Sequence, residues 1–288
     1  MFNSFSKSIL FAPLLSLLLG GVLVVSCGDD DNEEDAQTSS SNQNGGNNGG
    51  SNDSGSENEF PGKVYTVNGV SFKMIAVKGG TFQMGNDDGY YEWEYPVHQV
   101  TLSDYYIGET EVSQELWSAV MGCNPSNFTG NMQRPVETVS WNDCQTFISR
   151  LNQLTGETFR LPTEAQWEYA ARGGNKSKGY TYSGSNAIDD VAWYNYNSDR
   201  MTHPVKTKSP NELGIYDMSG NVWEWCSDWF GAHSSDAQTD PTGPATGSYR
   251  VVRGGSWTSD CATGCRVADR GGFTPAITGG GLGLRLAY

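Results

Sequence analysis

The sequence predicts an α+β fold with little regular secondary structure. The chain of 288 residues contains 36 glycines and nine tryptophans, a composition typical of frequent turns and aromatic packing. Long runs of helical apolar periodicity are few, and short apolar runs between turn residues predict strands. The residues from Phe60 onward contain no internal repeat and no linker, so we expect a single mixed domain there.

The net charge of −15 argues against two classes of partner. A protein that binds nucleic acid must neutralise phosphates, yet this chain carries 33 acidic against 18 basic side chains. The same excess argues against a polybasic membrane patch. Residues 28–59 hold nine acids and no base, so residues 60–288 keep 24 acids and 17 bases, a charge of −7. We therefore expect no nucleic-acid partner.

The first 27 residues predict a targeting segment. Lys7 precedes an apolar stretch from Ile9 to Val25, which Pro13 and two glycines make too short and broken for a bilayer span of about 20 apolar residues. The stretch ends in Val-Val-Ser-Cys at Cys27, which resembles the lipobox of bacterial lipoproteins. The alternative is an ordinary secretory signal with a chance cysteine. Acylation of Cys27 would attach the protein to a membrane without a transmembrane helix.

Residues 28–59 predict a disordered tether. They are rich in Asn, Gly and Ser and lack aromatic residues, so they cannot bury enough apolar surface to order themselves. A flexible chain of this length would hold the domain on the order of 30 Å from its anchor. The acidic run Asp29–Asp35 is similar to signals that send lipoproteins of Bacteroidetes-type bacteria to the outer face of the outer membrane. The alternative is a charge run that only keeps the tether solvated.

Three stretches of the domain predict helices. Ser113–Met121 carries apolar residues on one face. Ser140–Leu154 begins with a capping serine and continues at helical spacing until Gly156. Thr163–Arg172 begins with a capping threonine, has Gln166 as the capping-box partner, and stops at two glycines.

Short apolar runs bounded by turn residues predict strands around these helices. The domain is therefore expected to combine a few helices with several small strands. The expected strands are Val70–Val77, Thr81–Met84, His98–Leu102, Tyr105–Ile107, Arg250–Arg253, Cys265–Ala268 and Gly283–Leu286.

The three histidines restrict the catalytic chemistry that we expect. His98 opens an alternating strand and His203 precedes a proline, so we interpret both as framework hydrogen-bonding residues, with metal ligation as the alternative. His233 is expected in a loop. A 2-His-1-carboxylate iron site would need two of them to converge, which their spacing does not support. The chain has no Gly-x-Ser-x-Gly elbow, P-loop or dinucleotide fingerprint.

Five cysteines follow Cys27, an odd number for an oxidising compartment. Cys144 lies on an apolar helix face and Cys226 in a tryptophan cluster, so both are interpreted as buried packing residues. Cys261 and Cys265 lie four apart in a segment rich in Gly, Ser and Thr. They are candidates for a disulfide or for a soft metal such as Cu(I).

The stretch GIYDMSGNVWEW from Gly214 predicts a turn with two carboxylates. Asp217 and Glu224 bracket a glycine turn whose carbonyls could join them around a hard cation, and Ca²⁺ prefers such oxygen ligands. The alternative is a structural turn in which Glu224 pairs with an arginine. The spacing alone does not decide between the two.

Several motifs follow one another in a fixed order along the domain. They are GGTFQMG from Gly79, PVHQVTL from Pro96, RLPTEAQWEYAARGG from Arg160, GNVWEW from Gly220, RGGSW from Arg253 and GLRL from Gly283. Together they resemble the signatures of the formylglycine-generating enzyme family, also called the sulfatase-modifying factor domain, over roughly residues 70–288. The resemblance implies an elaborated C-type-lectin-like α+β domain with low regular content.

The resemblance also implies two metal ions. The family's enzymes oxidise a sulfatase cysteine to formylglycine with O₂ and a Cu(I) ion, held by two cysteines that lie five positions apart after the Gly-Gly-Ser-aromatic motif. Cys261 and Cys265 are the catalytic candidates, but they lie only four apart, so copper chemistry there is in doubt. The family's structural Ca²⁺ site matches Asp217, Gly220, Val222 and Glu224.

A second resemblance concerns the C-terminal segment. Its framework of RGGSW, CRVADR and GLRL looks like that of the variable proteins of diversity-generating retroelements, many of which bind ligands with this lectin-like domain. Residues between these parts could each arise from an asparagine codon by changes in its first two bases, although the same residues are ordinary in loops. Those expected to contact a ligand are Thr258, Ser259, Asp260, Thr263, Gly264, Phe273, Ile277 and Thr278.

These observations predict a surface-exposed outer-membrane lipoprotein that binds an unidentified protein or glycan ligand. The binding surface would comprise the loops Thr258–Gly264 and Gly271–Gly281, with Trp257 as a buried anchor and Phe273 as a contact aromatic. One alternative is a copper-dependent formylglycine-generating oxidase that acts on a sulfatase cysteine. The other is a structural component of an envelope or secretion assembly.

Overall fold

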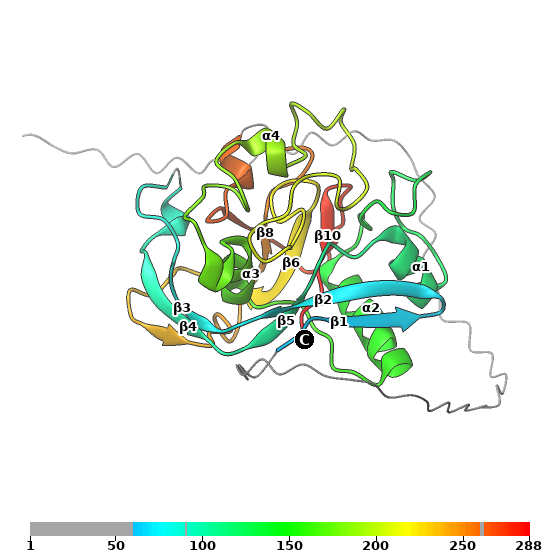
Figure 1. Cartoon of the computed structure of the whole chain (residues 1–288), viewed down its shortest axis with the longest axis horizontal. Coiled ribbons are helices and arrows are strands. Elements are labelled where there is room, and N and C mark those ends of the chain that lie inside the picture. Colours follow the sequence, from blue (N-terminus) through cyan, green and yellow to red (C-terminus); the bar gives the residue numbers. More distant parts are fainter. Residues whose placement is uncertain (1–59, 90, 260–261) are drawn as a thin grey trace, which may run out of the picture. The chain divides into compact units, whose positions relative to one another are not determined.

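The computed structural model describes residues 60–89, 91–259 and 262–288 (Figure 1). The predicted targeting segment with Cys27, the predicted tether, Asp260 and Cys261 lie outside these ranges. Within them, no helix has the length and the apolar character needed to cross a membrane. Short helices and three small sheets confirm the predicted α+β class in the described part of the chain.

The first sheet is antiparallel and contains β1 (Lys63–Val67), β2 (Val70–Val77) and β5 (Tyr105–Gly108), in that order. Asn68 and Gly69 join β1 to β2 with φ angles of 48° and 83°. Two consecutive positive φ angles match a tight hairpin turn whose twist agrees with that of the strands. The turn therefore sets the register of the hairpin.

The second sheet joins parts of the chain that are far apart in sequence. β3 (Gly80–Met84) pairs antiparallel with β4 (His98–Leu102), and β4 pairs in parallel with the two-residue β7 (Gln238–Thr239). The 3-10 helix η1 (Glu92–Glu94) lies in the connection between β3 and β4. This sheet brings the segment before β7 beside the start of β4.

The third sheet is central to the domain and has the strand order β10-β6-β8-β9. Its strands are β6 (Trp223–Trp229), β8 (Arg250–Arg253), β9 (Arg270–Phe273) and β10 (Leu282–Leu284). β10 pairs in parallel with β6, and the other pairs are antiparallel.

The three predicted helices are confirmed as α1 (Gln114–Met121), α2 (Trp141–Thr155) and α3 (Glu164–Ala171). A capping box of Ser140 and Asp143 begins α2, and that of Thr163 and Gln166 begins α3. The sequence did not predict the short helices α4 (Ile188–Val191), η2 (Gly174–Lys176) and η3 (Ala262–Cys265).

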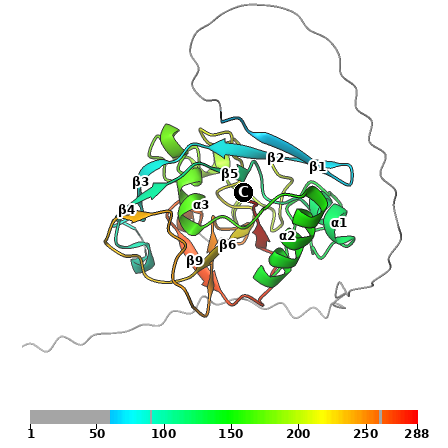
Figure 2. The ribbon, with the colours of Figure 1, turned by 90° about the horizontal axis from the view of Figure 1, so that it is seen from below.

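Strand β6 separates two hydrophobic clusters. Trp225 packs with α1 and α2, where Trp117 and Phe147 stack with ring centroids 4.8 Å apart. Cys226 points to the other cluster, which contains Trp167 of α3. Seen from below, α1 and α2 lie on one side of β6 and α3 on the other (Figure 2). Both faces of β6 are therefore buried.

The strand predicted over Cys265–Ala268 is wrong. This segment ends η3 and turns, and the neighbouring strand β9 begins only at Arg270. The guanidinium of Arg253 accounts for the difference, because it donates to the carbonyls of Val267, Ala268 and Asp269. Those carbonyls are thereby used by a side chain instead of by a neighbouring strand.

Candidate functional site

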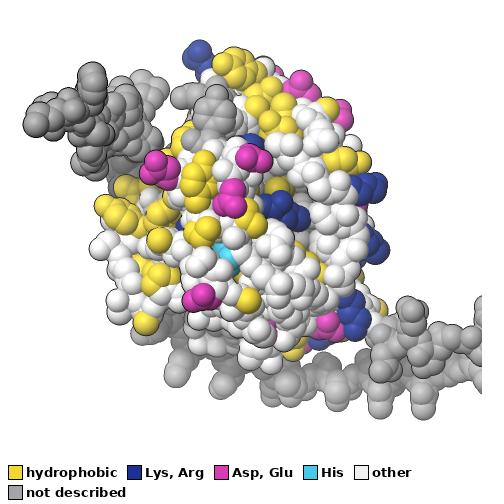
Figure 3. Space-filling model, turned by 90° about the vertical axis from the view of Figure 1, so that its left-hand side faces the viewer, with side chains coloured by type: hydrophobic (Ala, Val, Ile, Leu, Met, Phe, Trp, Pro, Cys, Tyr) yellow, Lys and Arg dark blue, Asp and Glu magenta, His cyan; other side chains and the backbone are white. Residues whose placement is uncertain are grey.

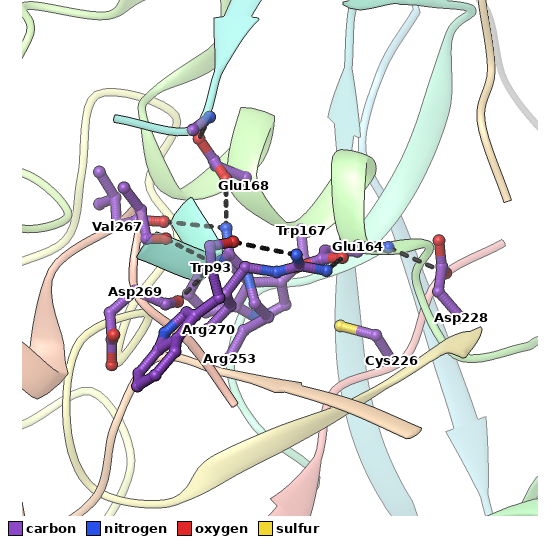
Figure 4. A network of polar contacts seen from close by, with 12 residues as sticks. Trp93, Glu164, Trp167, Glu168, Cys226, Asp228, Arg253, Val267, Asp269 and Arg270 are labelled. Carbon is purple, nitrogen blue, oxygen red and sulfur yellow. Dashed lines mark hydrogen bonds and ion pairs between the residues drawn. The ribbon is translucent and has the colours of Figure 1, made fainter. Parts of the chain in front are cut away.

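The recognised sequence motifs meet in a buried ionic network. Helix α3 places Glu164 and Glu168 one turn apart, and each faces an arginine from the third sheet (Figure 4). Nη2 of the completely buried Arg253 pairs with Oε2 of Glu168. Nε and Nη2 of Arg270 each donate to an oxygen of Glu164 at 2.6 Å. The network ties α3 to β8 and β9, the strands that flank the first predicted loop.

The arginines keep both glutamates of α3 ionised. Burial alone would raise the pKa of Glu168, but Arg172 and Arg253, with the Gly85 N–H that donates at 2.9 Å, lower it to about 2. Burial likewise acts to raise the pKa of Glu164, and the charges of Arg270 and Arg253 outweigh it. These buried pairs are compensated charges that hold the framework in one geometry.

Two further carboxyls at the edge of the network have raised pKa values. Burial raises the pKa of Asp228 to about 7, and the negative charge of Glu164 adds to this. Burial and the charge of Glu94 raise the pKa of Asp269 to about 7 against the charges of Arg253 and Arg266. Oδ1 of Asp269 is buried and accepts no hydrogen bond within the described part of the chain.

These raised pKa values predict that the domain is less stable at pH 8 than at pH 5, although the lowered pKa of His233 acts in the opposite direction below about pH 6.5. A carboxyl with a native pKa near 7 contributes stability below its unfolded pKa near 4, and loses that contribution as the pH rises through 7. Glu168 is ionised throughout this window because its pKa is about 2. Urea midpoints measured at both pH values would check the sign.

The same measurement on Asp269→Asn should give a smaller difference between pH 5 and pH 8. Asp104→Asn is the matched control, because hydrogen bonds from Lys78 and Gly79 hold the pKa of the exposed Asp104 below its usual value. This control should leave the difference unchanged. An equal effect of the two substitutions would contradict the assignment.

The first predicted loop begins with two glycines in the left-handed region. Gly254 and Gly255 have φ angles of 94° and 74° and turn the chain out of β8. The indole N–H of Trp257 then donates to the carbonyl of Gly280 at 2.7 Å, and its ring meets Phe128 edge-on. Trp257 therefore links the two predicted loops, but it is half-buried and not the buried anchor that the sequence predicted.

The predicted contact residues differ in exposure. Thr258, Ile277 and Thr278 are exposed, whereas Ser259, Thr263, Gly264 and Phe273 are half-buried, and Asp260 lies outside the described residues. Ser259 Oγ accepts the Ser256 N–H at 3.0 Å, which fixes the turn after Trp257. The Phe273 ring packs edge-on against Trp225 at 6.4 Å, toward the core. Its role as a contact aromatic stays a prediction.

The predicted calcium residues lie beside Arg285. Its Nη2 and Nε donate to Oε1 and Oε2 of Glu224 at 2.6 and 2.9 Å, and the Trp167 indole donates to Oε2 at 2.6 Å. Glu224 thus has the arginine partner of the structural alternative. Burial raises the pKa of Asp217 to about 6, and its Oδ2 accepts the Lys206 N–H.

Backbone N–H groups of this turn also form hydrogen bonds. The N–H of Gly220 donates to Gly254 O at 2.8 Å, and the N–H of Val222 donates to Glu111 Oε1 at 3.1 Å. Among the described residues, no group of three or more His, Cys, Asp or Glu side chains has an arrangement that would hold a metal ion. Calcium binding through two carboxylates and two carbonyls stays a prediction.

The cysteines have different roles. Cys144 and Cys226 are buried free thiols, which agrees with the predicted packing roles. Cys123, for which the sequence made no prediction, is disulfide-bonded. Cys265 is completely buried. Because Cys261 is not described, the predicted catalytic pair stays a prediction.

Two histidines that the sequence spacing did not predict to be neighbours lie close together in the fold. The rings of His98 and His233 have centroids 4.8 Å apart, and both line a cavity of about 500 Å³ with Asp228 and Arg270. His98 also bonds to Pro96 O at 3.0 Å, as a framework residue would. The predicted framework role of His203 agrees with its 2.8 Å contact to Ser198 O. No local sequence signal indicated the convergence of the first two.

Comparisons with known proteins agree with the motifs. The family profile described as the sulfatase-modifying factor enzyme 1-like domain matches residues 65–288. Chaperone protein LppX of Paenibacillus barcinonensis is 36% identical over 267 residues, which cover 75% of this chain and 89% of that protein. The formylglycine-generating enzyme of Streptomyces coelicolor is 32% identical over 284 residues, with coverages of 74% and 88%.

A solved structure adds a further similarity. Treponema denticola variable protein 1 matches with a TM-score of 0.73 and 39% sequence identity, over 78% of this chain and 98% of that one. The similarity thus extends from sequence motifs to the arrangement of the elements.

Proposed function

Because this chain belongs to the sulfatase-modifying factor enzyme 1-like domain family, we propose that it is a surface lipoprotein which binds a protein or glycan ligand through its C-terminal loops. Similar proteins include a formylglycine-generating enzyme and a protein named variable protein 1, so membership alone does not decide between catalysis and binding. Acylation of Cys27 and an outer-membrane location are part of the proposal and rest on sequence.

The proposal rests on a difference in side-chain exposure between framework and loop residues of the C-terminal segment. The arginines of the framework, Arg253, Arg270 and Arg285, are at most 3% exposed, whereas Ile277 is 39% exposed. Thr258 and Thr278 are exposed as well. Loop residues supported by a rigid scaffold can contact a partner, and can vary, without loss of the fold. This arrangement suits recognition.

The copper-dependent alternative is favoured by the 32% identity to a formylglycine-generating enzyme. Two thiolates, here Cys261 and Cys265, would suit Cu(I). Cys265 has no exposed surface, and a Cβ on Gly255 would stand 2.8 Å from its sulfur. A Cu(I) ion bound to a thiol that is buried beneath the backbone would be poorly accessible to O₂ and to a substrate peptide.

A double loop variant tests the binding proposal. The chain is applied to arrays of glycans and of cell-surface proteins, and retained ligands are titrated against Ile277→Asp/Thr278→Arg. We expect affinity to fall tenfold or more, because removal of a central contact residue costs more than about 1 kcal/mol. Leu154→Asp is the control, since Leu154 is also exposed, at 51%, but lies at the far end of α2.

Further measurements distinguish the three candidate functions, namely ligand binding, copper-dependent oxidation and a structural role in an assembly. Cys261→Ser and Cys265→Ser should leave ligand capture intact. Copper-dependent O₂ uptake on a cysteine-bearing sulfatase peptide, abolished by either cysteine change, would establish the oxidase instead. Stable co-purification with an envelope partner, unaffected by the loop variant, would support the assembly component. Unchanged affinity of every ligand in the loop variant would contradict the proposed surface.

A further inference from the structure

We propose that the cavity beside β4 binds a primary ammonium group, carried by a small amine or by a lysine side chain. The cavity lies between the start of β4, the end of β6 and residues 231–244, and measures about 500 Å³. This volume is within the range of about 300–1,000 Å³ typical of small-molecule sites. None of the predicted ligand-contact residues lines it. It is therefore a second site, separate from the C-terminal loops.

His98 offers a lone pair to this cavity. Its Nδ1 lies 3.0 Å from the carbonyl oxygen of Pro96, which can only accept a hydrogen bond. The proton of the neutral ring is therefore assigned to Nδ1, and Nε2 is left as an acceptor. Since His98 is only 4% exposed, bulk water has little access to that acceptor.

His233 has unused hydrogen-bonding capacity. Both its ring nitrogens are buried and have no hydrogen-bond partner among the described residues, although the ring centroid lies 4.8 Å from that of His98. Burial lowers the pKa of His233 to about 4, and the charge of Arg270 contributes, so the ring is neutral at pH 7 and one nitrogen is an acceptor. Unpaired buried polar atoms are costly, and a ligand would satisfy them once the His233 ring turns toward the cavity, because neither nitrogen has accessible surface in this conformation.

Asp228 supplies the charge. Its Oδ2 accepts hydrogen bonds from the Glu164 N–H at 3.0 Å and from Ser227 Oγ at 2.9 Å, and no salt bridge reaches it from the described residues. Arg270 is engaged with both oxygens of Glu164, so these two charges cancel. Figure 4 shows Asp228 at one end of the network, beyond Glu164. Arg250 and Arg160 interact with Asp228 at longer range, but within the described residues no cation pairs directly with an ionised Asp228.

An ammonium group matches this set of acceptors. It has three N–H donors, and the residues that line the cavity include the carboxylate of Asp228 and the imidazoles of His98 and His233. Met84, Trp229, Pro241 and Pro244 provide apolar walls for a methylene chain. Figure 3 shows the face with β3 and β4, where a small part of a histidine is visible among uncharged polar, hydrophobic, acidic and basic side chains.

Other ligands fit less well. An anion would meet the unpaired carboxylate, while Arg270, the one arginine that lines the cavity, already pairs with Glu164. A divalent metal would need at least three ligating side chains, and the described part of the chain contains no such group. The charge and donor pattern thus favour an organic cation.

Titration calorimetry on the whole chain tests the proposal with two probes, 1,5-diaminopentane and Nα-acetyl-lysine amide. At least one should bind with one site per chain, and n-pentanol, which has the chain but no charge, should bind at least tenfold more weakly. Binding of the diamine alone identifies a free amine as the source. Binding of the lysine amide identifies a protein side chain. Absence of binding by both would overturn the proposal.

Two variants on different elements locate the site. Asp228→Asn removes the charge but keeps an oxygen for the Glu164 N–H, and His233→Phe keeps an aromatic ring but removes both nitrogens. Each should weaken binding tenfold or more without lowering the melting temperature. Asp236→Asn is the control, because this exposed carboxylate belongs to the same loop but does not line the cavity. Full affinity in both cavity variants would overturn the site.

The unmodified chain provides an independent readout. Because the pKa of Asp228 is about 7, affinity should rise about tenfold between pH 6 and pH 8, as the carboxylate ionises. An affinity that falls or stays constant over this range would contradict the assignment. The charged or titratable groups near Asp228 are Glu164, Arg270, His98, His233, Arg250 and Arg160.

Discussion

Replacement of Arg285 by methionine is expected to lower the free energy of unfolding by about 3–5 kcal/mol. Arg285 is completely buried, pairs with both oxygens of Glu224, and donates to the carbonyls of Gly108 and Tyr216. Without it, the Trp167 indole is the only donor to the buried Glu224 carboxylate that remains among the described residues. A buried charge without a counter-charge is strongly destabilising, and the urea midpoint would report the loss.

The control for this substitution is a surface ion pair of similar length. Lys73 Nζ lies 3.1 Å from Glu109, but the lysine side chain is 47% exposed. Lys73→Met should change the free energy of unfolding by no more than about 1 kcal/mol, because water screens the pair. Arg285→Met combined with Glu224→Gln should recover part of the loss. Equal midpoints for the two single variants would show that Arg285 does not compensate Glu224.

Gly220→Ala is expected to destabilise the domain by about 2–5 kcal/mol. Gly220 has a φ of 82°, a conformation that costs an alanine about 1–2 kcal/mol. A Cβ there would also stand 2.3 Å from Trp193 O and 2.8 Å from Trp193 N, so the two backbones must separate. Such overpacking costs typically about 1–3 kcal/mol in addition. Denaturation by urea would measure the sum.

Gly214→Ala isolates the backbone contribution. Gly214 belongs to the same motif and has a φ of 78°, but a Cβ there would meet nothing within 4 Å. Only the conformational cost of about 1–2 kcal/mol is expected. If both alanine variants lose the same stability, close approach of Trp193 is not the reason for glycine at position 220.

Local signals were sufficient to predict the helices α1, α2 and α3. The cap of α2 uses Ser140 and Asp143, and its end uses Gly156 with a φ of 72°, all within a few positions of the helix. The ion partners of Glu164 and Glu168 could not be located in this way. Arg270 and Arg253 lie 106 and 85 positions further along the chain. Only the resemblance to a family indicated that these motifs belong to one framework.

Long-range contacts explain what the sequence did not predict. The segment Cys265–Ala268 has a strand-like composition, but the Arg253 guanidinium donates hydrogen bonds to backbone carbonyls of this segment, where the chain turns. The strand β6 was missed because both of its faces are buried, so its residues do not alternate between apolar and polar. The meeting of His98 and His233 depends on the path of the chain between β6 and β7, which carries no periodic signal.

The pairing of the last segment has a consequence for biosynthesis. β10 closes one edge of the central sheet beside β6, Ala287 bridges Ile107 and Arg160, and Tyr288 exchanges two backbone hydrogen bonds with Tyr106. A ribosome that has translated up to Gly281 has therefore made a domain without its closing strand. For the exported protein proposed above, this order of events would delay folding until β10 has been translated, and so leave the polypeptide in a form that a translocation channel can accept.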